Sequence, residues 1–143
     1  MISIKSVQTV DDSQDITELL TTGRLYRHKG TYLIAYNEST ATGYEGSKTT
    51  LRLTDDGSIH LKRSGSTSSN LIIEKGKKHH CHYGTLYGDF MVGIATDQVS
   101  STLSDAGGDL YFKYTVDINA SYMSENEIFV NVKECKTSDG IHA

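Results

Sequence analysis

Apolar and polar side chains alternate along most of the chain with a period of two residues. The clearest run covers residues 110–119, where every second side chain from Leu110 to Ile118 is apolar or aromatic. This period is typical of a β-strand with one buried face and one solvated face. The same alternation, bounded by turn-forming residues, predicts further strands at residues 2–10, 31–38, 48–54, 59–63, 71–73 and 128–132.

The pattern centres on residues 83–96, a Tyr-x-Thr-x-x-Gly corner followed by a strand. From Leu86 onward, Phe90, Val92 and Ile94 share one face, in which Gly88 leaves a gap. We expect this face to be buried, so the strand that follows the corner packs one side against the core. The bulky side chains expected to point inward are Tyr36, Phe90, Phe112 and Tyr114.

Residues 15–28 form a longer extended segment that Gly23 interrupts. A glycine inside a strand is typical of a sharp bend, so one long strand here is expected to contribute to two walls. Residues 13–20 are also compatible with a helical turn, and no other segment has a helical period.

Many short strands with almost no helix predict a sandwich or a barrel. With one apolar face per strand, we expect an all-β fold, a single antiparallel up-and-down barrel of about eight strands. A chain of 143 residues fits one domain. We expect it to cover residues 1–135, followed by a flexible C-terminal tail at residues 136–143.

Composition and charge narrow the choice of partners. The formal net charge of −4 predicts no general attraction to nucleic acid or anionic membranes, although it is compatible with a local basic patch. No apolar run has the length of a membrane span, and the start of the chain lacks the features of a signal peptide. We therefore expect a cytoplasmic protein in which Cys81 and Cys135 are free thiols.

Several short landmarks occur in a characteristic order between residues 2 and 134. They are Thr22-Gly23, Tyr36-x-Glu38, Thr49-Thr50, Arg63-Ser64-Gly65, Tyr83-x-Thr85-x-x-Gly88 and Leu110-Tyr111-Phe112-x-Tyr114. In this order and spacing the chain resembles the YwiB-like family, bacterial proteins of unknown function with a calycin-type (lipocalin-like) barrel. The resemblance implies that fold and no particular activity.

Two charged residues occupy positions that the alternation assigns to the interior. Arg63 follows the parity of Ile59 and Leu61, and Glu38 follows that of Tyr36. A buried charge must be paired or lie at a wet opening. Either Arg63 binds a carboxylate or phosphate group of a ligand, or it pairs with Glu38 and closes one end of the barrel.

In the ligand-binding alternative, aromatic and hydroxyl side chains complete the site. Tyr36 and Tyr114 form its walls. Tyr83 and Thr85, from the corner, are the remaining members of the predicted ligand-binding set.

The run His79-His80-Cys81-His82 suggests a metal cluster at first sight. On a strand, however, its side chains divide between two faces, so at most two ligands converge where zinc requires three or four.

Motifs of common enzymes are also absent from the sequence. The chain lacks a nucleophile elbow and a phosphate-binding glycine loop. We expect no metal, no cofactor and no catalysis. The basic turn at residues 75–78 is expected to protect an edge strand.

The sequence thus predicts non-catalytic binding of a small, partly apolar, anionic ligand inside the barrel. The alternative is an interaction module with a packed interior that binds a protein or RNA through its surface. An interior cavity favours the first, and a filled interior with an outer patch favours the second. The identity of the ligand, the oligomeric state and the biological process are not encoded in these patterns.

Overall fold

The computed structural model describes residues 1–29, 31–38, 45–54, 56–66, 68–85, 88–118 and 121–133, with only the backbone of residues 84 and 85. Within these ranges the regular structure is entirely β, in one sheet of eleven strands. The strands are β1 (Ile2–Val10), β2 (Ser13–Thr21), β3 (Gly23–His28), β4 (Thr31–Asn37), β5 (Ser47–Leu53), β6 (Ile59–Gly65), β7 (Ser69–Ile73), β8 (Lys78–Thr85), β9 (Gly88–Ser101), β10 (Gly107–Ile118) and β11 (Ser121–Lys133).

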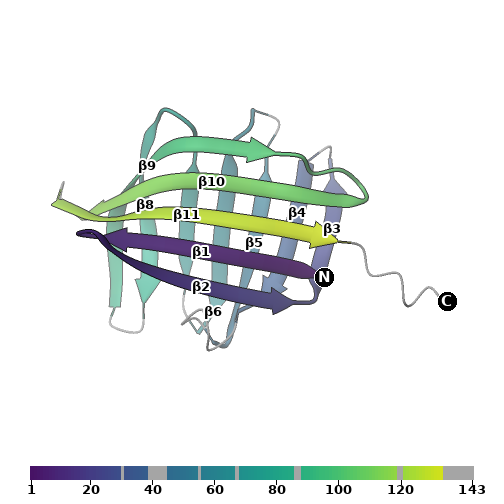
Figure 1. Ribbon diagram of the computed structural model, residues 1–143, viewed down its shortest axis with the longest axis horizontal. Coiled ribbons are helices and arrows are strands. Elements are labelled where there is room, and N and C mark those ends of the chain that lie inside the picture. Colours follow the sequence, from purple (N-terminus) through teal and green to yellow (C-terminus); the bar gives the residue numbers. More distant parts are fainter. Residues whose placement is uncertain are drawn as a thin grey trace.

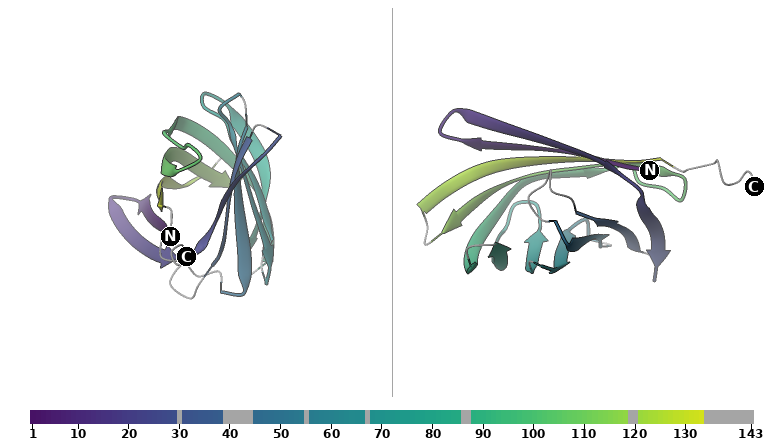
Figure 2. Two further views of the ribbon diagram at one scale, coloured as in Figure 1. Left: turned by 90° about the vertical axis from the view of Figure 1, so that its right-hand side faces the viewer. Right: turned by 90° about the horizontal axis from the view of Figure 1, so that it is seen from below.

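The sheet curls into a half-barrel with two layers. Its strand order is β2-β1-β11-β10-β9-β8-β7-β6-β5-β4-β3, and all neighbouring strands are antiparallel. Strands β1, β2, β10 and β11 run across the direction of β3–β8 (Figure 1). Turned views show the sheet curling around an interior (Figure 2). The all-β antiparallel prediction is confirmed, whereas the expected number of about eight strands is wrong.

The expected bend at Gly23 is where the chain passes from one edge of the sheet to the other. Strands β2 and β3 are separated only by Thr22, yet they occupy opposite ends of the strand order. A Cβ atom on Gly23 would lie 2.4 Å from the carbonyl oxygen of Ala35 and 2.4 Å from Cδ1 of Ile2. Only glycine fits here, because Ile2 of β1 and the backbone of β4 approach this position too closely for a side chain. This close approach brings β1 against β3 at the place where the two layers meet.

Alternation along the strands places the core between the two layers. In the described part of the chain, seven of the eleven strands contribute fully buried apolar residues: Ile2, Ile34, Ile59, Ile73, Ile94, Leu110, Phe112 and Val130. The rings of Phe112 and Tyr114 stack with centroids 5.9 Å apart. Phe90 is an exception to the predicted bulky core, because it remains 41% exposed. It lies two residues from the start of β9, at the margin of the sheet.

Two local expectations are corrected. The stretch around residues 83–96 belongs to two arms of a hairpin, in which Tyr83 of β8 pairs with Phe90 of β9. Residues 13–20 belong to strand β2 rather than to a helical turn, because they pair along β1 from Val10 to Ser3. Leu86, Cys135 and the predicted tail at residues 136–143 lie outside the described residues.

A second contact between the layers lies at the start of β4, away from Tyr36 at its other end. The hydroxyl of Tyr32 donates to Oδ1 of Asp105, in the turn between β9 and β10, at 3.1 Å. Nη1 of Arg27 lies 3.7 Å from the same oxygen. This polar contact therefore joins the two layers at the end of β4 that lies away from Tyr36.

An interior cavity at the Arg63–Glu38 pair

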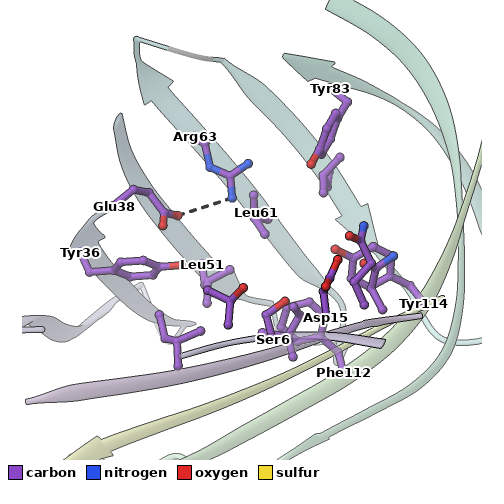
Figure 3. A pocket seen from close by; sticks show the side chains of 16 residues that line it. Ser6, Asp15, Tyr36, Glu38, Leu51, Leu61, Arg63, Tyr83, Phe112 and Tyr114 are labelled. Carbon is purple, nitrogen blue, oxygen red and sulfur yellow. Dashed lines mark hydrogen bonds and ion pairs between the residues drawn. The ribbon is translucent and has the colours of Figure 1, made fainter. Parts of the chain in front are cut away.

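A cavity of about 190 Å³ lies between the two layers. Leu51, Leu61 and Phe112 provide much of its apolar lining. Arg63 and Tyr83 project into it from β6 and β8, while Ser6 and Tyr114 face it from the other layer (Figure 3). The interior is therefore not completely filled by side chains, which is the property that the ligand-binding alternative requires.

Arg63, Glu38 and Thr49 form a buried polar cluster in the cavity wall. Nη2 of Arg63 lies 3.5 Å from Oε2 of Glu38, and Nε donates to Oγ1 of Thr49 at 3.3 Å. The Thr49 hydroxyl in turn donates to Glu38. The two charged side chains are only 9% and 2% exposed, so each needs the other for compensation. The internal ion pair of Arg63 and Glu38, one of the two predicted alternatives, is therefore present, and it lines the cavity.

Tyr36 extends this cluster with a neutral hydroxyl. Burial raises the pKa of Tyr36 far above its ordinary value of 10.0, and the Glu38 carboxylate raises the pKa further. The phenol therefore keeps its proton under all ordinary conditions. It presents a hydrogen-bonding group to the cavity without adding charge.

Polar side chains on β1, β2 and β11 line the opposite side of the cavity. Nδ2 of Asn126 donates to Oγ of Ser124 at 3.0 Å, and both residues are buried. Ser6 and Gln8 face the cavity from β1, and the exposed Asp15 lies at its opening. Sequence reasoning missed this side. The sequence feature that could have revealed this polar side is the change along β1 from apolar to polar residues at inward positions.

Five of the six predicted site residues line this one cavity: Tyr36, Glu38, Arg63, Tyr83 and Tyr114. Tyr36, Arg63, Tyr83 and Tyr114 come from four strands, and Glu38 directly follows the first of them. The inward positions that strand parity predicted for Arg63, Glu38, Tyr36 and Tyr114 are confirmed. The side chain of Thr85, the sixth, lies outside the described part of the chain.

The histidine run of β8 divides between the two faces of the sheet. His79 bonds to Oε1 of Glu74 at 2.9 Å through Nε2. Cys81 is buried, and its Sγ accepts the backbone N–H of Ile72 at 3.4 Å. Burial raises the pKa of the Cys81 thiol. The described residues contain no group of three or more His, Cys, Asp or Glu side chains placed to bind a metal ion.

Comparison with known proteins identifies the family. A family model described as a domain of unknown function (DUF1934) matches residues 2–130, so the chain belongs to this family. The structure is similar to the crystal structure of the ywiB protein from Bacillus subtilis, with a TM-score of 0.75, 19% sequence identity, and 93% and 90% of the two chains covered. These findings confirm the resemblance to YwiB-like proteins, and at this identity the structural match supports the fold alone.

Two further comparisons are brief. No curated protein matches the chain. Across the residues that the structure describes, no helix has the length and apolar character needed to cross a membrane.

Proposed function

We propose that the cavity binds a small, partly apolar molecule that carries one anionic group, and that the protein performs no chemistry on it. The observation that supports this proposal is the position of Arg63, a buried cation in the wall of an unfilled space that has both an apolar and a polar side. An arginine in such a place provides directional donors for a carboxylate or phosphate. The Phe112 and Tyr114 rings supply the apolar surface for the remainder of the ligand.

The size of the cavity limits the ligand. An apolar cavity of roughly 150 Å³ accommodates one benzene molecule. The 190 Å³ available here therefore suits a benzene-sized body with a carboxylate attached. A compound as small as benzoate is the appropriate first probe.

The charge balance of the cluster makes a specific demand on this ligand. Glu38 lies 3.5 Å from Arg63, which is longer than the ~2.7–2.9 Å of a tight charge-assisted hydrogen bond. A ligand carboxylate that approaches Arg63 to the shorter distance of ~2.7–2.9 Å would interact with it more strongly than Glu38 does. Glu38 nevertheless repels the ligand, so neutralising Glu38 should strengthen binding while removing the Arg63 charge should weaken it.

The first experiment is native mass spectrometry of gently purified protein, followed by calorimetric titration with benzoate and with the neutral benzamide. We expect benzoate to bind more tightly than benzamide. We expect Arg63→Met to weaken benzoate binding by roughly tenfold or more, because a hydrogen bond to a charged group contributes ~1.5–3 kcal/mol. Glu38→Gln, which retains the polar contact with Thr49, should improve binding.

A purely structural ion pair would give a different result. In that case both substitutions would lower the free energy of unfolding without changing benzoate affinity relative to benzamide. Urea unfolding of each variant identifies this outcome, since removing one partner of a buried pair costs ~3–5 kcal/mol. Absence of any retained mass and of any benzoate binding by the folded protein would reject the proposal.

A further inference from the structure

The outer surface of β3–β8 carries a separate feature, which does not depend on the cavity. Every charged side chain at an outward position of these strands is basic. We call the following set the basic face: Arg24, His28, Lys48, Arg52, His60 and Lys62. Its members alternate with the buried residues Leu51 and Leu61 and with their neighbours, so they point away from the core.

Strand register brings these cations together. Lys62 lies opposite Thr50, between Lys48 and Arg52 on β5, and Arg52 lies directly opposite His60. The four Arg and Lys side chains of the basic face are all exposed. None of the four makes an ion pair within the described part of the chain. Like charges on neighbouring strands repel each other, so a bound anion would relieve the repulsion between these side chains.

The outer surface of the other layer is mixed in charge. Its outward positions hold Glu18 on β2, Asp109 on β10, and Glu125 and Glu127 on β11, together with Lys5 on β1, Lys113 on β10 and Lys133 on β11. Lys113 lies 3.6 Å from Glu125, so part of this charge is paired. The net charge of −4 predicts no general attraction to nucleic acid, and it does not reveal a local concentration of cations such as the basic face.

Two shallow hollows shape the basic face. The first, of about 320 Å³, is lined by Arg24, Tyr26, Asn37 and Lys48 among others. The guanidinium of Arg24 lies over the ring of Tyr26, 5.3 Å from its centroid, and that ring is 39% exposed. A cation, an exposed aromatic ring and an amide side by side can hold a phosphate, stack a base and bond to its edge.

The second hollow continues the same surface along β3 and β5. It has a volume of about 400 Å³ and is lined by His28, Lys29 and Arg52, with Asp56 at one side. Both hollows open on the outer side of the layer formed by β3–β8, whose strands lie side by side in Figure 1. A chain of phosphates could pass from one hollow to the other.

We propose that the basic face binds single-stranded nucleic acid, with phosphates on Lys48, Arg52 and Lys62 and a base stacked on Tyr26. The outer side of a curled sheet is convex (Figure 2), and a flexible single strand can follow such a surface. A rigid duplex, which is itself convex, would touch it over a small area only. The exposed ring and Asn37 favour a partner with bases over a membrane of anionic lipids.

The test measures fluorescence anisotropy of a labelled single-stranded RNA of mixed sequence, about as long as one binding site of 4–16 nucleotides. Lys48→Glu/Lys62→Glu reverses two charges on the basic face. Lys5→Glu/Lys133→Glu makes the same change in net charge on the opposite layer and is the matched control. Circular dichroism establishes that both double variants are folded.

We expect RNA affinity to fall with salt, with a slope of about −0.7 per phosphate contact. The Lys48/Lys62 double variant should lose roughly tenfold or more in affinity and about 1.4 in slope, while the control retains wild-type binding. Tyr26→Ala should lose about tenfold in affinity with no change in slope, because stacking is not electrostatic.

Three results would overturn the proposal. One is no binding of the RNA at low salt. Another is equal loss of affinity in the two double variants, which would mean that only the total charge matters. The third is binding of heparin, anionic vesicles or a duplex of the same length as tightly as the single strand, together with no effect of Tyr26→Ala.

Discussion

Adding a single methyl group at Gly23 should weaken the junction between the two layers. The Cβ atom of Gly23→Ala would lie 2.4 Å from the carbonyl oxygen of Ala35 and 2.4 Å from Cδ1 of Ile2. Each distance is about 1 Å shorter than the ~3.5 Å of an optimal contact. The Ile2 side chain can move, but the carbonyl belongs to the backbone of β4, which pairs with β3.

We therefore expect a cost near the middle of the ~1–3 kcal/mol range for overpacking. A cost of about 2 kcal/mol corresponds to a decrease of about 8 °C in Tm for a chain of this size. Urea unfolding and thermal melting followed by circular dichroism measure both quantities.

Ile2→Val provides an internal check, because it removes Cδ1, the atom that meets the new methyl group. Alone it should cost ~0.5–1.5 kcal/mol. Combined with Gly23→Ala, it should relieve one of the two clashes, so the double variant is less destabilised than the sum by about 1 kcal/mol. Ile4→Val, on the same strand and face, should show no such coupling. A neutral Gly23→Ala, or strict additivity with Ile2→Val, would refute the close approach.

Two further predictions concern ionisable groups in the core. The pKa of Tyr36 is raised above 10.0, so the folded state holds its proton more tightly, and the associated stability is complete below pH 10 and lost above it. Urea unfolding should show a shallower alkaline decrease in Tyr36→Phe than in wild type; identical pH profiles would contradict this. In a Cys135→Ser background, Cys81 should react with a chromogenic thiol reagent only after denaturant is added, because burial raises its pKa. Prompt reaction of the native protein would show that the thiol is accessible.

Local alternation was sufficient to predict that Arg63 and Glu38 point inward. Arg63 follows two apolar inward positions on β6, and Glu38 continues the parity of Tyr36. Once both are inside, the need to compensate two buried charges brings them together. The position of Thr49 between them depends on the register of β4, β5 and β6, which the sequence alone does not specify.

Features that depend on distant strands were not predictable from local patterns. The polar side of the cavity exists because β1 pairs with β11, whose partner residues lie more than a hundred positions away. The basic face similarly depends on the adjacent strands β3, β4, β5 and β6. In the sequence its cations are dispersed, and the turn at residues 75–78 is the more obvious basic cluster. Strand counting failed at residues 15–28, because one extended segment belongs to two different edges.

The place of β1 in the sheet has a consequence for biosynthesis. The N-terminal hairpin of β1 and β2 joins the rest of the sheet through β11, the last strand among the described residues. Strands β3 to β10 can pair in the order in which they leave the ribosome, since each is adjacent to the next. At a synthesis rate of ~5–20 residues per second, the first hairpin waits several seconds with Ile2 and Ile4 uncovered, although both are buried in the folded protein. Nascent chains of this protein should therefore be clients of ribosome-associated chaperones until β11 has emerged.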